Sequence, residues 1–373
     1  MVFVFPFDSW NELLLPNGIE CENDIARNVE IQLRKLIIRD QYIKDDTPII
    51  ANIEVQKSIT NTMWGVAPIF RYSSTKGGSF HHIPIINDVS DWNKLSFPII
   101  TSDEIASNEN HHIVLDAIGD IVPVDLVGIK KFNFHMMHWY CDYRGLDNML
   151  LDLYDDPDMV HMAIRFFTDG LYSMYKQYEE QNLISLNNDC TNHYTGGVGY
   201  TDELPDKAGF DANHIRLCDV WGAAEAQEFS LVSPEMHEEF ILQYEREILQ
   251  LFGLNGYGCC DDLSKKLDGV LKIKNLRRVA VCPWADISKF TPRLLKNYIM
   301  TWKPQPAYIA FDKFDKTIIA NELKNGLLLA KGGIIELVLR DTTTCRNQPE
   351  RFGQWIDIAR ESIEEVWVPD ARL

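Results

Sequence analysis

The sequence predicts an α/β protein built on a TIM-type (β/α)8 barrel with an irregular, partly helical N-terminal extension. Short apolar runs that are typical of buried strands recur along the chain, and the later ones alternate strictly with helical patterns. Such alternation indicates a parallel sheet whose strands are joined by helices. Polar and chemically reactive side chains follow several of these runs, as they do at the catalytic mouth of a barrel.

The individual elements follow from periodicity and from proline and serine signals. The segments that read as strands are 49–55, 121–128, 183–190, 215–221, 253–259, 279–281, 307–311 and 334–339. The segments that read as helices are 26–38, 101–116, 146–154, 158–181, 233–252, 293–300, 317–331 and 350–365. Pro157 suits the first turn of its helix, and Ser233 before Pro234 is a good N-cap. Segment 73–93, which carries His81 and His82, reads as a long loop that acts as a lid or covers the site.

Composition and charge are typical of a soluble cytoplasmic protein. Lys and Arg number 36 against 55 Asp and Glu, which leaves a net charge of −19. A surface this acidic argues against nucleic acid and against an anionic membrane as partners. No apolar run approaches the roughly 20 residues that a membrane-spanning helix needs. We expect residues 111–373 to form the barrel and residues 1–110 to pack on it as an extension, because no linker divides the chain into two domains.

The cysteines draw attention to the middle of the chain. The eight cysteines are scattered, without the density of a disulfide framework, and no C-x-x-C pair predicts a zinc ribbon or a thioredoxin-type site. Cys259 and Cys260 end one apolar run and precede two acids, and a second run ends in Cys282 and Pro283, followed by Trp284 and Asp286. Each cysteine alone is equally well a small apolar filler of the core. Together, the two runs with reactive ends indicate a site.

Three potential metal ligands are spaced three residues apart within segment 132–144. On a helix, His135, His138 and Cys141 would share one face and could bind a metal ion. On a strand, the two histidines would point to opposite faces and could not share an ion. The aromatic content of the segment favours extended structure, so we interpret the histidines as residues that line a pocket.

Several longer motifs together resemble the uroporphyrinogen decarboxylase superfamily, and in particular a bacterial branch near the corrinoid-dependent methyltransferases. The resemblance covers roughly residue 63 to the C-terminus. Its carriers are RGLDNMLLDLYDDPDMVH (144–161), GGVGYTDELP (196–205), WGAAEAQEF (221–229), YGCCDDL (257–263), NLRRVAVCPWAD (275–286) and ELVLRD (336–341). The resemblance implies a single barrel domain, a small-molecule substrate, and the homodimer that is common in the superfamily.

The positions at which this sequence differs from the superfamily's motifs indicate which of the superfamily's activities to expect. Nothing matches the N-terminal RQAGR with which the decarboxylases grip substrate carboxylates, and the last histidine is His237, so decarboxylation of a porphyrinogen is not expected. The methyltransferases bind zinc through H-x-C and a distant cysteine. Here Tyr257 stands where the histidine would be and Cys259 keeps the thiolate position. The resemblance therefore implies zinc held by Cys259, Cys345 and Cys282 or Glu228, which is not the usual ligand set.

These observations lead to three functional hypotheses. In the first, the chain moves a methyl group from a methyl ether or amine to a corrinoid carrier protein, with zinc as the Lewis acid that activates the leaving group. In the second, a metal-independent decarboxylase or lyase holds a small carboxylic acid with Arg144, Arg340 and Lys303, and Asp286 protonates the carbanion. In the third, the barrel binds a ligand without chemistry, and Tyr257 at the place of the zinc histidine favours this.

The hypotheses draw on one set of candidate residues. The candidate catalytic residues are Glu225, Glu228, Asp286 and Asp341. The candidate substrate-binding residues are His135, His138, Arg144, His193, Tyr200, Tyr257, Trp284, Lys303 and Arg340. The candidate metal ligands are Cys259, Cys345 and Cys282.

Overall fold

Seven parallel strands form the main sheet, in the order β1-β13-β12-β11-β10-β9-β8. The computed structural model describes residues 1–14, 18–75, 78–207 and 209–367. From β8 to β13, neighbours in the sheet are also consecutive strands of the sequence. The strands are β1 (Val2–Val4), β8 (Asn133–Phe134), β9 (Trp221–Ala224), β10 (Leu254–Tyr257), β11 (Leu276–Val281), β12 (Ile299–Trp302) and β13 (Ile334–Leu339). The predicted α/β class with a parallel sheet is confirmed.

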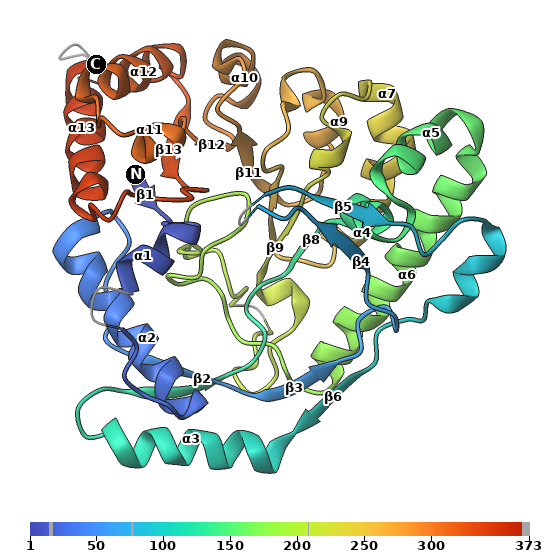
Figure 1. Ribbon diagram of the computed structural model, residues 1–373, viewed down its shortest axis with the longest axis horizontal. Coiled ribbons are helices and arrows are strands. Elements are labelled where there is room, and N and C mark those ends of the chain that lie inside the picture. Colours follow the sequence, from blue (N-terminus) through green and yellow to red (C-terminus); the bar gives the residue numbers. More distant parts are fainter. Residues whose placement is uncertain (15–17, 76–77, 208, 368–373) are drawn as a thin grey trace.

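The helices that follow these strands lie on their outer side, as Figure 1 shows for α7, α9, α10, α12 and α13. Pro157 lies in the first turn of α6 and Ser233 caps α7 through the backbone N–H of Met236, as the sequence predicted. Asp156 caps α6 through the backbone N–H of Met159. The helices are α4 (Met136–Arg144), α5 (Leu146–Asp155), α6 (Pro157–Glu180), α7 (Pro234–His237), a π-helical turn (Glu238–Leu242), α8 (Gln243–Leu249), α9 (Leu267–Val270), α10 (Ile287–Leu294), α11 (Ala307–Ala310), α12 (Lys316–Leu329) and α13 (Glu350–Val366). Short 3-10 turns cover Val89–Lys94, Leu217–Asp219, Gln227–Phe229 and Leu263–Lys265.

The N-terminal third of the chain combines helices with three small sheets. Strand β2 pairs with β7 in parallel, whereas β3 pairs with β6 and β4 with β5 in antiparallel. The strands are β2 (Ile53–Gln56), β3 (Ser58–Asn61), β4 (Ile69–Tyr72), β5 (Phe80–Ile83), β6 (Ile100–Asp103) and β7 (Val124–Val127). The helices are a 3-10 turn (Phe7–Ser9), α1 (Trp10–Leu14), α2 (Asp24–Ile38), a π-helical turn (Arg39–Ile43) and α3 (Glu104–Ile118). Part of the predicted 73–93 loop is thus the hairpin strand β5, and residues 76–77 lie outside the described residues.

The first strand of the chain was not predicted. Val2–Val4 pairs in parallel with Leu337–Leu339 of β13, and all three of its residues are buried. A strand covered on both faces is continuously apolar and lacks the alternation that marks a half-buried strand. The division at residue 110 stays a prediction, but the chain's opening residues belong to the main sheet.

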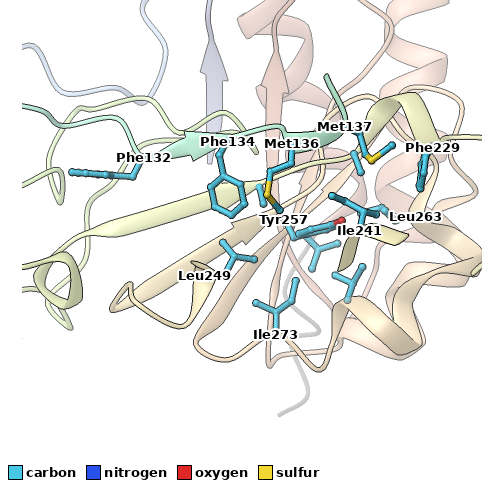
Figure 2. Packing of buried hydrophobic residues seen from close by; sticks show 14 of the residues in the cluster. Phe132, Phe134, Met136, Met137, Phe229, Ile241, Leu249, Tyr257, Leu263 and Ile273 are labelled. Atoms are coloured by element: carbon cyan, nitrogen blue, oxygen red, sulfur yellow. The ribbon is translucent and has the colours of Figure 1, made fainter. Parts of the chain in front are cut away.

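Segment 132–144, for which extended structure was predicted, is mostly helical. After the two residues of β8, the chain forms α4, so the extended prediction is wrong for Met136–Arg144. Met136, Met137, Tyr140 and Cys141 are buried at the one- and four-residue spacing of a helical face. Figure 2 shows Phe134 and Met136 in the same buried cluster as Tyr257 of β10. Burial of this face against the core outweighs the low helix preference of its aromatic residues.

Two predicted elements near residue 300 are also wrong. The predicted helix 293–300 ends at Leu294, because Leu295 takes a φ of +44°, and residues 299–302 form β12 between β11 and β13. The predicted strand 307–311 is helix α11. Segment 183–190 contributes one isolated bridge between Ile129 and Ile184, and the strand predicted at 215–221 begins only at Trp221. The physical cause is the same in each case, because strand partners from distant segments decide where a short apolar run pairs.

The glycine-bearing connection between α6 and β9 covers the inner face of the sheet. Figure 1 shows this yellow-green segment running through the middle of the surrounding elements. The backbone oxygen of Val198 accepts a hydrogen bond from Arg278 of β11 at 2.9 Å. A Cβ at Gly256 of β10 would lie 2.6 Å from the Thr195 hydroxyl, and one at Gly196 would lie 2.1 Å from the Thr301 methyl of β12. The connection between α6 and β9 therefore lies so close to the main sheet that Gly196 and Gly256 leave no room for a side chain.

We expect Gly196→Ala to destabilise the protein by more than about 1 kcal/mol, because Gly196 combines this close approach with a φ of +137°. Gly332→Ala is the matched control, since Gly332 has a φ of +97° but no atom within 4 Å of the added methyl group. Urea denaturation of both variants measures the difference. An equal loss in both would show that the backbone angle alone is responsible and that the contact with Thr301 contributes nothing.

Candidate functional site

Reactive side chains from five strands follow the carboxyl ends of the main sheet. His135 comes directly after β8, Glu225 after β9, Cys259 after β10, Lys303 after β12 and Arg340 after β13. Because the strands are parallel, these ends meet at one edge of the sheet, which is where open and closed α/β folds hold their ligands. The cluster agrees with the sequence-based expectation that reactive side chains follow several strands.

His138 and Glu228 form the first contact pair of the cluster. His138 Nδ1 lies 2.9 Å from Glu228 Oε1, and the helical turn of α4 carries the imidazole past the end of β8. The hydrogen bond to the carboxylate raises the pKa of His138 to about 8, against the opposing effect of burial. His138 is therefore mostly an imidazolium at neutral pH and can donate a proton.

His135 and Glu225 form the second pair. His135 Nδ1 lies 2.7 Å from Glu225 Oε1, and the backbone N–H of Gln227 donates to Glu225 Oε2 at 3.0 Å. Tyr194 belongs to the glycine-bearing connection between α6 and β9. Its ring lies edge-on to the His135 ring, with the ring centroids 5.5 Å apart. The Glu225 side chain is buried, with an exposed fraction of 5 %. Because both carboxylate oxygens have partners, the carboxylate is held in one orientation.

Cys259 lies beside a buried lysine. The Lys303 ammonium donates to the backbone oxygen of Cys259 at 3.0 Å and lies 3.4 Å from its Sγ. The pKa of the Cys259 thiol is lowered because Cys260 donates a hydrogen bond to it and because Lys303 and Arg340 attract the thiolate. The two sulfur atoms are 3.6 Å apart. Cys259 is thus a thiolate facing cations.

Arg340 completes the positive side of the cluster. It donates to Asp341 Oδ1 at 3.0 Å and to the backbone oxygen of Tyr194 at 2.5 Å, and its guanidinium lies 5.2 Å from the centre of the Tyr194 ring. Arg340 is 7 % exposed and Lys303 is 3 % exposed. Both cations are nearly buried, so solvent screens their attraction for the Cys259 thiolate only weakly, although Asp341 partly balances the charge of Arg340.

A second layer of polar residues adjoins His138. Asp142, one helical turn further along α4, lies 3.7 Å from His138 Nε2, and its other oxygen lies 3.3 Å from His82 Nδ1 of β5. His82 in turn borders a pocket of about 340 Å³ that is lined by Phe80, His81, His82, Pro84, Gly145, Leu146, Asp147 and Asn148. Burial raises the pKa of Asp142 although both histidines oppose this.

Six predicted site residues make contacts outside the pairs described above. Arg144 binds Asp152 through two nitrogens at 2.8 Å and donates to backbone oxygens of residues 86 and 87, so it joins α4 to α5 and to the segment that follows β5. Tyr257 is fully buried and its hydroxyl contacts Glu245 and His237. His193 is buried against Trp221, and burial together with Arg278 lowers its pKa to about 3. Asp286 caps α10, Trp284 is exposed, and Tyr200 contacts Cys190.

The predicted zinc ligands do not come together. Cys345 donates to Glu12 of α1 at 3.2 Å, whereas Cys259 faces Cys260 and Lys303. Burial raises the pKa of both Cys345 and Cys282 to about 12, which disfavours the thiolate that a metal ligand must be. Within the described ranges, no group of three His, Cys, Asp or Glu side chains has a geometry that could hold a metal ion. The residues present therefore do not fit the zinc site that the resemblance implies.

Asp142 is the residue of this cluster that the sequence did not indicate, whereas His82 and Cys260 lie in segments that the sequence had singled out. Asp142 follows His138 by four residues, so a helical interpretation of segment 132–144 would have predicted their contact. Tyr194 belongs to the glycine-bearing connection between α6 and β9, whose polar and aromatic residues suggest from the sequence a loop that closes over a substrate.

Comparison with known proteins adds no family to this picture. Neither a scan against models of known families nor a search of curated proteins finds a match to the chain. Among the described helices, none combines the length and the apolar character that crossing a membrane requires.

The pair of His138 and Glu228 predicts a pH dependence of stability. The folded-state pKa of about 8 exceeds the ordinary value of 6.5, so the stabilising proton is fully present below pH 6.5 and is lost as the pH rises through about 8. We expect urea denaturation of the wild type to show a larger fall in stability over this window than Glu228→Gln. The difference should stay below about 1 kcal/mol because His138 is partly exposed. Parallel pH profiles for the two proteins would contradict the pairing.

Proposed function

We propose that the chain is a metal-independent enzyme of the lyase or decarboxylase type that acts on a small carboxylic acid at the strand-end cluster. The observation that carries this proposal is the pair of nearly buried cations, Lys303 and Arg340, beside Cys259 in a chain whose net charge is −19. A local positive site in an acidic protein selects anions from solution. The consecutive order of the parallel strands supports a β/α barrel as the scaffold.

The two cations would bind the substrate carboxylate. Arg340 presents a planar guanidinium, which suits bidentate binding of a carboxylate, and Lys303 adds a point charge. In the free protein Lys303 contacts the Cys259 thiolate, and Arg340 pairs with Asp341 and attracts the thiolate at longer range. A bound carboxylate would repel this thiolate, so binding should raise the pKa of Cys259 and protonate it. Loss of thiolate absorbance near 240 nm on addition of an acid would report binding without turnover.

His138 would supply the proton. In a decarboxylation the bond between the carboxylate carbon and its neighbour breaks, carbon dioxide leaves, and the electron pair stays on the remaining carbon. The His138 imidazolium then protonates that carbon and becomes neutral. Water reprotonates the ring, and Glu228 stabilises the charged form that results. His138 takes the role that was predicted for Asp286, because Asp286 is engaged in capping α10.

Release of labelled carbon dioxide from a panel of small carboxylic acids tests the proposal. We expect release from at least one acid, and Lys303→Met or Arg340→Met should lower kcat/KM by about 10²-fold or more, which is the cost of removing a charged hydrogen-bond partner at a buried site. Lys289→Met is the matched control, because Lys289 is an exposed lysine that pairs with Asp286. Loss of the thiolate absorbance without release of carbon dioxide would indicate a binding protein. The absence of both signals for every acid in the panel would contradict the proposal.

Methyl transfer to a corrinoid carrier protein is the second candidate. The observation that favours it is again the His138 imidazolium, which can protonate the leaving group of a methyl ether or amine without a metal ion. A corrinoid would supply the nucleophile for this reaction. Release of the phenol or amine from a methylated donor, only when a carrier protein is present, would support this candidate over the first.

A further inference from the structure

Two adjacent thiols at the end of β10 have a geometry that the proposed reaction does not use. The Sγ atoms of Cys259 and Cys260 are 3.6 Å apart, close enough for a hydrogen bond between the two thiols. The Lys303 ammonium lies 3.4 Å from Cys259 Sγ on the other side. Cys260 is partly exposed, so this pair can be approached from solvent.

The environment of this pair differs from that of three other thiols. Burial raises the pKa of Cys141, Cys282 and Cys345 to about 12, and Cys345 also donates to Glu12. The pKa of Cys259 is lowered instead, and that of Cys260 is raised because its proton is shared with its neighbour. Since the thiolate is the reactive form of cysteine, Cys259 is the attacking sulfur and Cys260 the sulfur that keeps its proton.

We propose that Cys259 and Cys260 are a peroxide-reactive dithiol that closes to a disulfide between adjacent residues. In the first step the Cys259 thiolate attacks one oxygen of hydrogen peroxide, a sulfur–oxygen bond forms, the oxygen–oxygen bond breaks, and the hydroxide that leaves takes a proton to become water. In the second step the Cys260 sulfur attacks the sulfenic sulfur of Cys259. A sulfur–sulfur bond forms, and the hydroxide leaves with the Cys260 proton as water. The two sulfurs lose two electrons, and one peroxide is reduced to two waters.

Closing this disulfide would change the charge balance of the strand-end cluster. Lys303 and Arg340 would lose their resident thiolate and face two neutral sulfurs. The inference itself rests on the arrangement of the two sulfurs and Lys303, and it holds whether or not the substrate is a carboxylic acid. Its test therefore uses sulfur chemistry as the readout and needs no substrate.

Peptide mass analysis after treatment with one equivalent of hydrogen peroxide tests the proposal on the full chain. After dialysis against a chelator at pH 7, we expect the peptide that contains both cysteines to lose two hydrogens and to resist alkylation until it is reduced. In Cys260→Ser the reaction should stop at a sulfenic acid on Cys259 that dimedone traps. Cys282→Ser is the matched control and should behave as wild type.

The role of Lys303 gives a second readout. Lys303→Met should slow the reaction of Cys259 with peroxide by roughly five- to tenfold, because a smaller thiolate fraction is only partly offset by higher intrinsic nucleophilicity. The proposal is overturned if both cysteines remain alkylatable after peroxide treatment, or if Cys141 and Cys282 react as fast. It is also overturned if the two cysteines resist alkylation without dialysis against the chelator but are alkylated after it, since a bound metal ion would then be what protects the thiols.

Discussion

Replacing Arg278 with methionine is expected to lower the free energy of unfolding by about 3–5 kcal/mol. Arg278 of β11 and Glu336 of β13 form an ion pair at 2.9 Å with side chains that are 5 % and 6 % exposed. The Thr301 hydroxyl also donates to Glu336, and Arg278 lies over the Trp221 ring. Without the guanidinium, a buried carboxylate would remain on the inner face of the sheet with only one neutral donor. Chemical denaturation at pH 7 measures the loss.

The adjacent residue provides the control. Arg277 pairs with Glu203 at the surface, where both partners are at least one-third exposed, so Arg277→Met should change the stability by less than about 1 kcal/mol. Replacing Arg278 and Glu336 together with apolar residues should recover much of the loss, because no uncompensated charge is left. A loss in Arg278→Met no larger than in Arg277→Met would show that Glu336 finds another partner or water.

Replacing His138 with glutamine is expected to lower kcat by about 10²–10⁴-fold on whichever substrate the chain turns over, since glutamine cannot donate the proton. Because the pKa of His138 is raised to about 8, wild-type activity that depends on its proton should fall as the pH rises through about 8. The variant's residual activity should not show this fall. Steady-state kinetics between pH 6 and pH 9.5 measures both effects.

His161 is the matched control for this experiment. It is another partly exposed histidine, with the Tyr244 hydroxyl at 2.8 Å from Nδ1 and a Glu239 oxygen at 3.8 Å from Nε2, but it lies on α6. His161→Gln should keep the wild-type rate and pH profile. If the two glutamine variants are equally active, His138 does not act as the acid and a different group in the cluster must supply the proton.

Elements with long periodic patterns could be predicted from the sequence alone. The apolar spacing of 317–331 and 350–365 predicted α12 and α13, and the run 334–339, apolar except for Glu336, predicted β13. In each case the pattern extends over several turns or over a whole buried strand, so local sequence and tertiary packing agree. The strand ends that carry Glu225, Cys259 and Arg340 were predicted for the same reason.

The contacts at the site depended on parts of the fold that no local pattern records. Cys345 was expected near Cys259 because it follows the last strand, but its loop turns toward α1, where Glu12 accepts three hydrogen bonds from residues 345–347. The aromatic residues of 132–144 favour extended structure locally. Burial of one face of α4 against the core outweighs this preference and stabilises the helix. That choice placed His138 against Glu228 and Asp142.

The sequence by itself determined the α/β class, the helices with long amphipathic faces, and the reactive residues that follow the strands, because each of these depends on neighbours within one or two turns. Only the tertiary structure decided that Lys303 and Arg340 face Cys259, that a glycine-bearing connection covers the inner face of the sheet, and that Val2–Val4 is a strand. These features join residues 44 to 335 positions apart. Such contacts arise from burial and charge pairing between distant segments, which leave no periodic signal in the chain.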